Sequence, residues 1–196
     1  FIEGSYISKK NSNHSTFFQI KINKKNSQVF YFENDALKFE QNFDFGSDLV
    51  LNDISKITSL NKETINFLLT NSLLVPEKEN QEFVEKEYFK NKNYRKIKKK
   101  LIFDIAAARI QELSEILLIK NVNLNSYLEK NKLIFLQIHD KSNFECFKDN
   151  YKLFFSKNDD LKVESNERIS LEEIINNANK LVNFGWKKEV IPIIQS

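Results

Sequence analysis

The stretch Ala36–Ile57, ALKFEQNFDFGSDLVLNDISKI, changes its hydrophobic period at one glycine. Before Gly46, residues 36–45 alternate between apolar and polar side chains, which predicts a β-strand. After Gly46, apolar residues recur near helical spacing as far as position 60, and either Ser47 or Asp48 can cap the start of a helix. A strand that leads directly into a helix is typical of an α/β protein.

Two more strands come before this stretch, and a second helix comes after it. Phe17–Ile22 alternates apolar and polar residues, and Gln28–Phe32 is rich in β-forming residues. The short polar stretch Asn23–Ser27 between them predicts a hairpin turn. Asn61–Ser72 predicts a helix, because its apolar residues fall on one helical face.

The middle of the chain contains a charged region and a long helix. Pro76 marks a break, and residues 77–92 are highly charged, which predicts exposed strands or a loop. The residues from Tyr94 to Ile119 predict one long helix. Its expected apolar stripe consists of Leu101, Ile105, Ala108, Leu113, Ile116 and Leu117.

Five cations gather where this long helix is expected to begin: Arg95, Lys96, Lys98, Lys99 and Lys100. A positive charge near a helix N-terminus opposes the helix macrodipole, at a cost of about 0.3–1 kcal/mol. Composition bias can produce such a cluster, since the whole chain is rich in Lys and Asn. An acidic partner would explain it equally well. The sequence leaves both interpretations open.

The last part of the chain alternates strands and helices. Three elements are expected in order: a buried strand at Leu133–Ile138, a short helix at Asn143–Tyr151 and another strand at Lys152–Ser156. A final helix is expected over Ser170–Phe184. Ser170 and Glu173 have the spacing of a capping box, and Gly185 stands where such a helix would stop.

The composition excludes some classes of protein. The chain has 196 residues, 41% of them apolar and 18 of them Phe, which is enough to build a core. Cys146 is its only cysteine, so no intrachain disulfide can form and we expect a reducing compartment. No apolar run approaches the roughly 20 residues that span a bilayer. Because the chain begins with Phe1 and contains no Met, we expect it to be part of a longer protein.

Charge and motifs argue against nucleic-acid binding and against catalysis. The net charge is only +3, which is too balanced to indicate a nucleic-acid binder, although Tyr94 adjoins the cations of residues 95–100. The chain has 3 glycines and none of the usual metal, nucleophile or phosphate-loop motifs. His139 and Cys146 are a conceivable nucleophilic pair, but their spacing alone is weak support. We therefore expect a protein-binding α/β module and not an enzyme.

Three features of the chain together resemble the C-terminal half of FtsA, the actin-like bacterial cell-division protein. The first is Ala36–Ile57, which carries an Asn-Asp-Ile signature at residues 52–54. The second is Asp104–Leu117, which is similar to the long helix of the family with its Arg-x-x-Glu core, here Arg109 and Glu112. The third is the order of strands and helices after residue 133.

This resemblance implies an architecture. We expect an α/β, actin-like (ribonuclease H-like) half-domain with a mixed sheet and helices, plus a small inserted α+β subdomain. Residues 1–70 and 131–196 would form the actin-like core. Residues 71–130 would form the insert, which contains the long helix.

The nucleotide-binding positions are where this chain departs from the family. FtsA proteins have an acidic, glycine-rich phosphate loop between the first two strands of this half, whereas residues 21–28 contain neither glycine nor acid. Residues 137–141 replace a second glycine-rich turn. The resemblance leaves four degenerate cofactor positions: Asn23, Lys24, Asn26 and Glu63. We expect ATP binding to be weakened or lost, with ATP and Mg²⁺ bound only if the degenerate cleft still accepts them.

The resemblance also implies a partner. In FtsA the insert binds the acidic C-terminal tail of FtsZ, the tubulin-like division polymer, through basic residues around the long helix. The family positions carried across are Arg95, Arg109 and Glu112, and the neighbouring cations Lys98 and Lys99 complete the predicted partner-binding residues. Arginine suits this role because its planar guanidinium binds carboxylates in a bidentate manner. Another interpretation makes Arg109 and Glu112 a simple i,i+3 pair on an exposed helix face.

The resemblance therefore predicts a non-catalytic cell-division adaptor that links the division ring to the membrane. Such a protein would self-associate into actin-like filaments and would lie in the cytoplasm, at the inner face of the membrane at the division site. Its membrane contact would use a C-terminal tail outside this sequence. Two alternatives remain open: an active actin-like ATP-binding filament protein and a related actin-like pilus-assembly protein.

Overall fold

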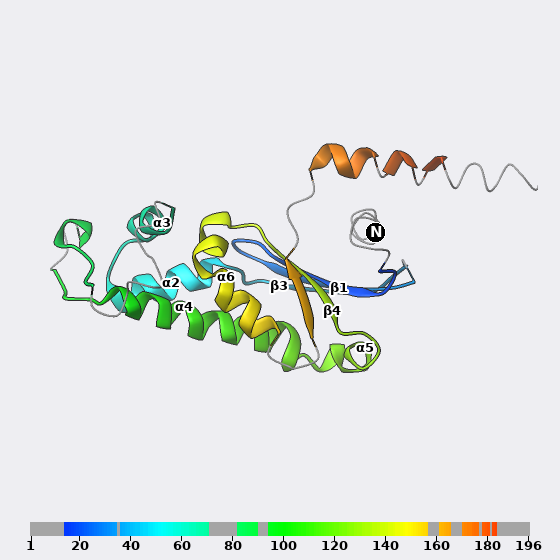
Figure 1. Cartoon of the computed structure of the whole chain (residues 1–196), viewed down its shortest axis with the longest axis horizontal. Coiled ribbons are helices and arrows are strands. Elements are labelled where there is room, and N and C mark those ends of the chain that lie inside the picture. The colour runs from blue at the N-terminus through cyan, green and yellow to red at the C-terminus, as the bar shows by residue number, and fades with distance from the viewer. Residues whose placement is uncertain are drawn as a thin grey trace, which may run out of the picture.

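The computed structural model describes residues 14–34, 36–70, 82–89, 94–156, 161–165, 170–176, 178–180 and 182–183 (Figure 1). The strands are β1 (Phe17–Ile22), β2 (Ser27–Glu33), β3 (Ala36–Phe43), β4 (Leu133–Ile138) and β5 (Lys162–Ser165). The main helices are α2 (Asp48–Thr58), α3 (Lys62–Thr70), α4 (Lys99–Ser114), α5 (Asn125–Leu128) and α6 (Lys141–Phe155). Short helical turns lie at Lys86–Phe89 (η2), Glu115–Ile119 (η3) and Val122–Leu124 (η4).

In the described part of the chain, five strands form one mixed sheet in the order β3-β2-β1-β4-β5. The first three strands pair antiparallel as a meander, whereas β4 runs parallel to β1 and β5 runs parallel to β4. A parallel pair needs a long crossover connection, and the chain from α2 to α5 supplies it between β1 and β4. The predicted mixed sheet with helices is confirmed.

The two faces of the sheet bury different sets of side chains. Phe18, Ile20 and Ile22 of β1 point toward α2, α4 and α6 and belong to the larger core cluster. Phe17 points to the opposite face, where it packs with Phe32, Leu133 and Phe135, and the partly buried Ile174 packs against this smaller cluster. Each such fully buried side chain contributes about 1.5–3 kcal/mol of hydrophobic stabilisation.

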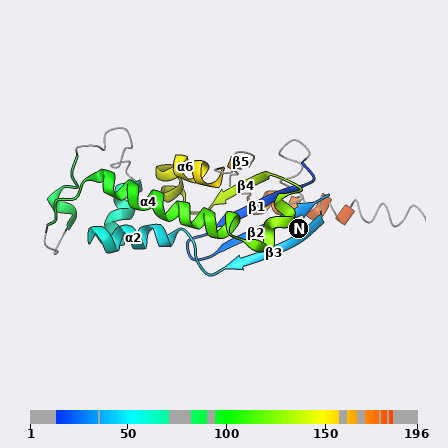
Figure 2. The same ribbon diagram turned by 90° about the horizontal axis from the view of Figure 1, so that it is seen from below.

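Helix α4 lies between α2 and α6 and packs against both (Figure 2). Its buried residues Phe103, Ala106 and Ile110 belong to the same core cluster as the residues of β1. The division into a core of residues 1–70 and 131–196 and an insert of residues 71–130 stays a prediction.

The long helix begins later than predicted, at Lys99 and not at Tyr94. The residues before it pair with the segment at 82–84: the Val84 N–H donates to the Ile97 carbonyl oxygen at 2.9 Å, and the Lys99 N–H donates to the Glu82 carbonyl oxygen at 2.9 Å. These backbone groups are satisfied by sheet-like pairing, so the helix cannot extend over them. Lys98, which has an extended backbone, is the N-cap.

The apolar stripe predicted for this helix is wrong in half of its members. Ile105, Leu113 and Leu117 are buried as expected, but Leu101, Ala108 and Ile116 are exposed. Because α2 and α6 contact α4 from two sides, its buried surface is broad and also takes in Ile102, Phe103, Ala106 and Ile110. A π-helical turn at its end, where the Lys120 N–H donates to the Glu115 carbonyl oxygen at 2.7 Å, brings both Leu117 and Leu118 into the core.

The C-terminal predictions are partly wrong. Residues 152–155 continue α6 and do not form a strand, because Tyr151 and Phe155 are four residues apart and both fully buried on one helical face. The strand β5 was not predicted. The capping box is confirmed: the Ser170 N–H donates to Glu173 Oε2 at 2.9 Å, and the Glu173 N–H donates to Ser170 Oγ at 3.1 Å. Gly185 lies outside the described residues.

Candidate functional site

The turn between β1 and β2 occupies the place of the phosphate loop in the predicted architecture. It is closed by its own side chains and backbone. The Asn23 N–H donates to the Asn26 carbonyl oxygen at 2.9 Å, and Asn23 Nδ2 donates to Asn26 Oδ1 at 2.6 Å. Lys24, Lys25 and Asn26 are exposed. Three of the four predicted cofactor positions, Asn23, Lys24 and Asn26, thus lie together in one turn.

This turn caps the first turn of α2 with backbone oxygens. The Ser47 N–H donates to the Asn23 carbonyl oxygen at 2.9 Å, and the Asp48 N–H donates to the Lys24 carbonyl oxygen at 2.9 Å. Ser47 is the N-cap residue of α2, as predicted, but its side chain makes no capping hydrogen bond, and its buried hydroxyl has no partner in the described structure. Phosphate binding at a helix N-terminus needs free N–H groups, and these two are occupied.

Gly46 makes this close approach possible. A Cβ atom at Gly46 would lie 2.7 Å from the Lys24 carbonyl oxygen and still closer to the Asn23 carbonyl oxygen. Any other residue would therefore push the turn away from the helix. The glycine that marks the strand–helix junction in the sequence provides space for a backbone cap.

The fourth cofactor position, Glu63, stands apart from the turn. It is exposed in the first turn of α3, whose N-terminus is capped by Asn61 Oδ1 accepting from the Thr64 N–H at 2.7 Å. No hydrogen bond or ion pair joins Glu63 to residues 23–26 in the part of the chain that the structure describes. After β4, the His139 N–H donates to the Ile22 carbonyl oxygen at 2.9 Å, which extends the parallel pairing to the end of β1.

The end of β4 also buries polar groups beneath α6. Asp140 is 5% exposed and Tyr151 is fully buried. Burial first, and then the nearby Asp140 carboxylate, raises the pKa of the Tyr151 phenol well above its ordinary value. Among the described residues, no group of three or more His, Cys, Asp or Glu could hold a metal ion.

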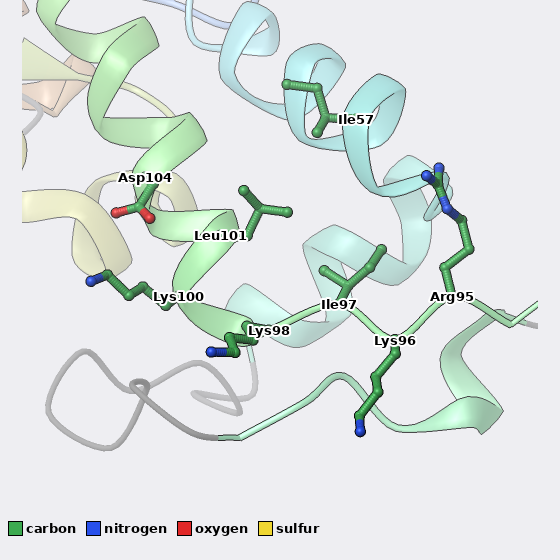
Figure 3. A pocket seen from close by; sticks show the side chains of 8 residues that line it. All are labelled: Ile57, Arg95, Lys96, Ile97, Lys98, Lys100, Leu101 and Asp104. Carbon is green, nitrogen blue, oxygen red and sulfur yellow. The ribbon is translucent and has the colours of Figure 1, made fainter.

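A second region, the groove between α2 and α4, is open, whereas the β1–β2 turn is closed by hydrogen bonds within the chain. Its larger hollow has a volume of about 750 Å³ (Figure 3). Ile57 of α2 and Leu101 of α4 stand on its two helical walls and are 50% and 38% exposed. The other lining residues are Arg95, Lys96, Ile97, Lys98, Lys100 and Asp104.

The cations of this hollow are only lightly engaged. Arg95 Nη1 donates to Ser59 Oγ at 3.2 Å, at the C-terminal end of α2. The Lys96 ammonium lies 4.6 Å from the centre of the Phe83 ring, a cation–π contact. Lys98 and Lys100 are exposed and have no ion-pair partner among the described residues. The predicted partner residues Arg95 and Lys98 thus lie on an open surface.

Lys99, the third predicted partner residue of this segment, is placed differently. It is 9% exposed, and its ammonium lies 2.9 Å from Glu82 Oε2 and 3.8 Å from Glu85 Oε1. Burial alone would lower the pKa of Lys99, but the hydrogen bond to Glu82 and the charges of both carboxylates outweigh it, so the pKa is raised. Lys99 therefore joins the 82–85 segment to α4.

A smaller hollow of about 350 Å³ continues the groove along α4. It contains Arg109 and Glu112, the two remaining predicted partner residues. The Arg109 guanidinium binds Asp53 of α2 through Nε and Glu112 through Nη1, the latter at 2.6 Å. The i,i+3 pair is confirmed, and Asp53 adds a link between the two helices.

Sequence reasoning missed the apolar part of this groove. Ile57 and Leu101 fit the core stripes of their helices by spacing, and nothing in the sequence distinguishes an apolar residue that faces the core from one at the margin of a helix–helix contact. Asp104 was also missed, although it lines both hollows.

Comparison with known proteins shows the fold. No family model and no curated protein matches the sequence. Among solved structures, the ethanolamine utilization protein EutJ from Carboxydothermus hydrogenoformans is 9% identical with a TM-score of 0.54, over 83% of this chain and 48% of that one. MreB 5 of Spiroplasma citri bound to AMPPNP is 14% identical with a TM-score of 0.51, over 97% and 60%.

PilM from a PilM–PilN type IV pilus biogenesis complex is 7% identical with a TM-score of 0.50, over 88% of this chain and 46% of that chain. These neighbours are actin-like, so the chain has an actin-like fold, as predicted. It spans between 46% and 60% of the length of the three neighbours. Within the described residues, no helix is both long and apolar enough to cross a membrane.

Proposed function

We propose that this chain is the partner-binding part of an actin-like adaptor protein, and that the groove between α2 and α4 is its docking surface. One observation carries the proposal: Ile57 and Leu101 stay exposed side by side with the cations Arg95, Lys98 and Lys100. Exposed apolar side chains rimmed by charge are typical of protein–protein interaction sites.

The partner we propose is the acidic C-terminal tail of FtsZ. This part of the proposal rests on the resemblance to FtsA, and the cations of the larger hollow support it by charge. The tail would place carboxylates against Arg95 and Lys98 and an apolar side chain between Ile57 and Leu101. The adaptor would then self-associate as actin-like proteins do and act in the cytoplasm at the division site, with its membrane contact made through a C-terminal tail outside this sequence.

A second candidate is a role in pilus assembly. A PilM–PilN type IV pilus biogenesis complex has a similar fold. In this case the same groove would bind a segment of a pilus-assembly partner, and the FtsZ tail would not bind.

We further propose that the protein has lost, or nearly lost, ATP binding and is not an enzyme. The support is the backbone cap on α2: the N–H groups of Ser47 and Asp48 are taken by carbonyl oxygens, and the turn at 23–26 has no glycine. Calorimetric titration of the protein at its full natural length with ATP and Mg²⁺ tests this. We expect no saturable heat at micromolar nucleotide, and a micromolar Kd would refute the claim.

The docking proposal is tested by titrating the chain with a fluorescent FtsZ C-terminal tail peptide and following anisotropy at two salt concentrations. We expect saturable binding that weakens with salt, because exposed charge pairs are screened. Arg95→Glu and Lys98→Glu should each weaken binding about tenfold or more, since each replaces an attraction with a repulsion.

Lys152→Glu is the matched control, because Lys152 is an exposed lysine on α6 outside the groove. It makes the same change in net charge and should leave the affinity within about twofold. Equal losses in all three variants would mean that only the net charge matters. No binding up to about millimolar peptide, or about 4 kcal/mol of affinity, would reject the FtsZ tail as the partner.

A further inference from the structure

We infer that the outer edge of β3 binds the same edge of a second copy of this chain, and that the two strands pair antiparallel about a two-fold axis at Gln41. Neither hollow of the groove between α2 and α4 is lined by a residue of β3. The inference therefore concerns a second surface and goes beyond the proposed function. A two-fold contact of this kind is closed, because each copy uses its β3 edge once.

The strand β3 is an edge strand of eight residues, Ala36–Phe43. Within the part of the chain that the structure describes, β2 is the only strand that pairs with it, and β3 lies at the margin of the sheet (Figure 2). The N–H and C=O groups on its outer side form a row that pairs with no described strand. Such a row is a template for pairing with a strand from another chain.

The opposite edge of the sheet is less suited to this role. The strand β5 has only four residues, of which Lys162 and Glu164 form an ion pair at 2.7 Å. Short edge strands and charged side chains are the means by which proteins protect an edge from pairing. β3 is twice as long, and after Lys38 its only charged residue is Glu40.

The regular part of β3 is Phe39–Phe43. The register with β2 shifts once, before Phe39, and runs without interruption from there to the end of the strand. A bulge bends an edge strand and increases its twist, so a partner strand would pair best with the uninterrupted run. The middle residue of that run is Gln41.

Symmetry and charge leave one register for this run. An axis perpendicular to the sheet keeps each side chain on its own face, and successive residues of a strand point to opposite faces, so the axis must pass through a residue. At Glu40 the axis would place Glu40 opposite Glu40 of the second copy, and at Asn42 it would place Glu40 opposite Asp44. Like charges directly opposite each other destabilise a strand pair, so Gln41 remains.

With the axis at Gln41, Phe39 of each copy lies opposite Phe43 of the other. Both rings are only partly buried within one chain. Phe39 packs with Tyr127 at 5.4 Å between ring centroids, and Phe43 packs with Phe45 at 5.3 Å. Aromatic pairs across two strands stabilise a sheet, so the second copy would extend a packing that each chain has begun.

The same register also matches the charged residues. Lys38 of each copy lies opposite Asp44 of the other, and Glu40 lies opposite the neutral Asn42. Lys38 and Asp44 are exposed, and neither has an ion-pair partner among the described residues. Opposite charges that face each other across two strands stabilise the pairing. The contact contains two such pairs, one at each end of the paired run.

The inference is tested by sedimentation equilibrium of the chain, of Lys38→Glu, of Asp44→Lys and of the variant that carries both changes. We expect the unmodified chain to form dimers, and each single change should weaken dimerisation about tenfold or more, since it turns two attractions into two repulsions. The double variant restores opposite charges at both places, so its dimer Kd should return to within about threefold of the original.

A second measurement tests the register. In a chain with Cys146→Ser, a cysteine at the axis (Gln41→Cys) should form a disulfide-linked dimer under mild oxidation faster than Glu40→Cys. Directly opposed residues have Cα atoms about 4.5–5.5 Å apart, within the range that a disulfide can bridge. Equal rates for the two variants would overturn the assignment of the axis to Gln41.

A chain that stays monomeric up to about millimolar concentration, or about 4 kcal/mol of affinity, would overturn the inference. So would a dimer whose Kd is the same in all four proteins, because it would use another surface. None of these variants changes a residue of the groove, so FtsZ-tail affinity should stay unchanged in all of them. Failure of this inference is thereby distinguished from failure of the proposed function.

Discussion

The two ends of helix α2 differ in how far the rest of the chain covers them. At its N-terminus, the N–H groups of Ser47 and Asp48 are capped by carbonyl oxygens of the β1–β2 turn, and Gly46 allows a contact too close for any side chain. At its C-terminal half, Ile57 stays exposed and faces a hollow lined with cations. One end is closed by the chain itself, and the other is open.

This difference is the basis of both proposals made for the chain, a closed nucleotide position and an open docking surface. Where a nucleotide would need free backbone N–H groups, this chain has used them for its own structure. Where a partner protein would need exposed apolar surface and unpaired charge, this chain has kept both. The same short helix therefore has one end occupied by the chain's own backbone and one end that we propose to bind a partner.

The largest expected effect is a loss of stability on disrupting the contact between the β1–β2 turn and the N-terminus of α2. Gly46→Ala should destabilise the chain by about 3 kcal/mol or more, because the new methyl group would overlap backbone oxygens that cannot move without losing the cap. Urea unfolding followed by circular dichroism measures this. Ser47→Ala is the neighbouring control and should change stability by less than about 0.5 kcal/mol, since its hydroxyl has no partner in the described structure.

The next effect concerns the exposed apolar residues of the groove, and we expect it in peptide affinity and not in stability. Changing both Ile57 and Leu101 to Ser should weaken peptide binding about tenfold or more, or about 1.4 kcal/mol. Stability should change little, because both side chains are already partly in water. In contrast, Ile54→Ser on the buried face of α2 should unfold the chain. If the exposed pair instead proved essential for stability, the groove would be a structural contact.

A smaller effect is expected from the ion pair that links the two walls of the groove. Asp53→Asn should cost about 1 kcal/mol of stability, because a partly buried arginine–carboxylate pair is lost. A double-mutant cycle with Arg109→Gln measures the coupling between the two side chains. Glu112→Gln, which removes only the exposed partner of Arg109, should cost less than about 0.5 kcal/mol. A larger loss of stability from Glu112→Gln than from Asp53→Asn would assign the coupling to the Arg109–Glu112 pair.

The smallest effect is a pH dependence far from the groove. The raised pKa of Tyr151 means that the folded chain keeps a proton that the unfolded chain loses above the ordinary value of 10.0. The unfolded state then binds fewer protons, so stability falls as the pH rises above about 10. Tyr151→Phe should make this fall less steep in urea titrations between pH 9 and about 11. An unchanged slope would contradict the assigned burial effect.

Much of the fold was predictable from the sequence, and the reasons are local. The apolar run at residues 17–22 matches β1, which is buried on both faces, and the alternation over residues 36–43 matches β3, where Phe39, Gln41 and Phe43 are partly buried on one face. The capping box at Ser170 and Glu173 uses only neighbouring groups. The extension of α6 over residues 152–155 was missed because a short aromatic run fits a strand as well as a helix. The sheet-like pairing before α4 was missed because its partner segment lies at 82–84.

The candidate site was predictable only in part. The cations at the start of α4 and the Arg109–Glu112 pair follow from spacing along one helix. The pairing of Lys99 with Glu82, the link from Arg109 to Asp53 and the exposure of Ile57 depend on how separate segments pack. No periodicity within one element carries that information.

The most direct test of the account is to map the chemical-shift changes of the backbone amides when the FtsZ tail peptide is added to the isotope-labelled chain. We predict changes concentrated at residues 55–59 and 94–104, on the two walls of the groove, with residues 23–26 and 46–48 unaffected. Changes confined to the β1–β2 turn, or to the sheet face around Phe17, would contradict the assignment of the groove as the binding surface.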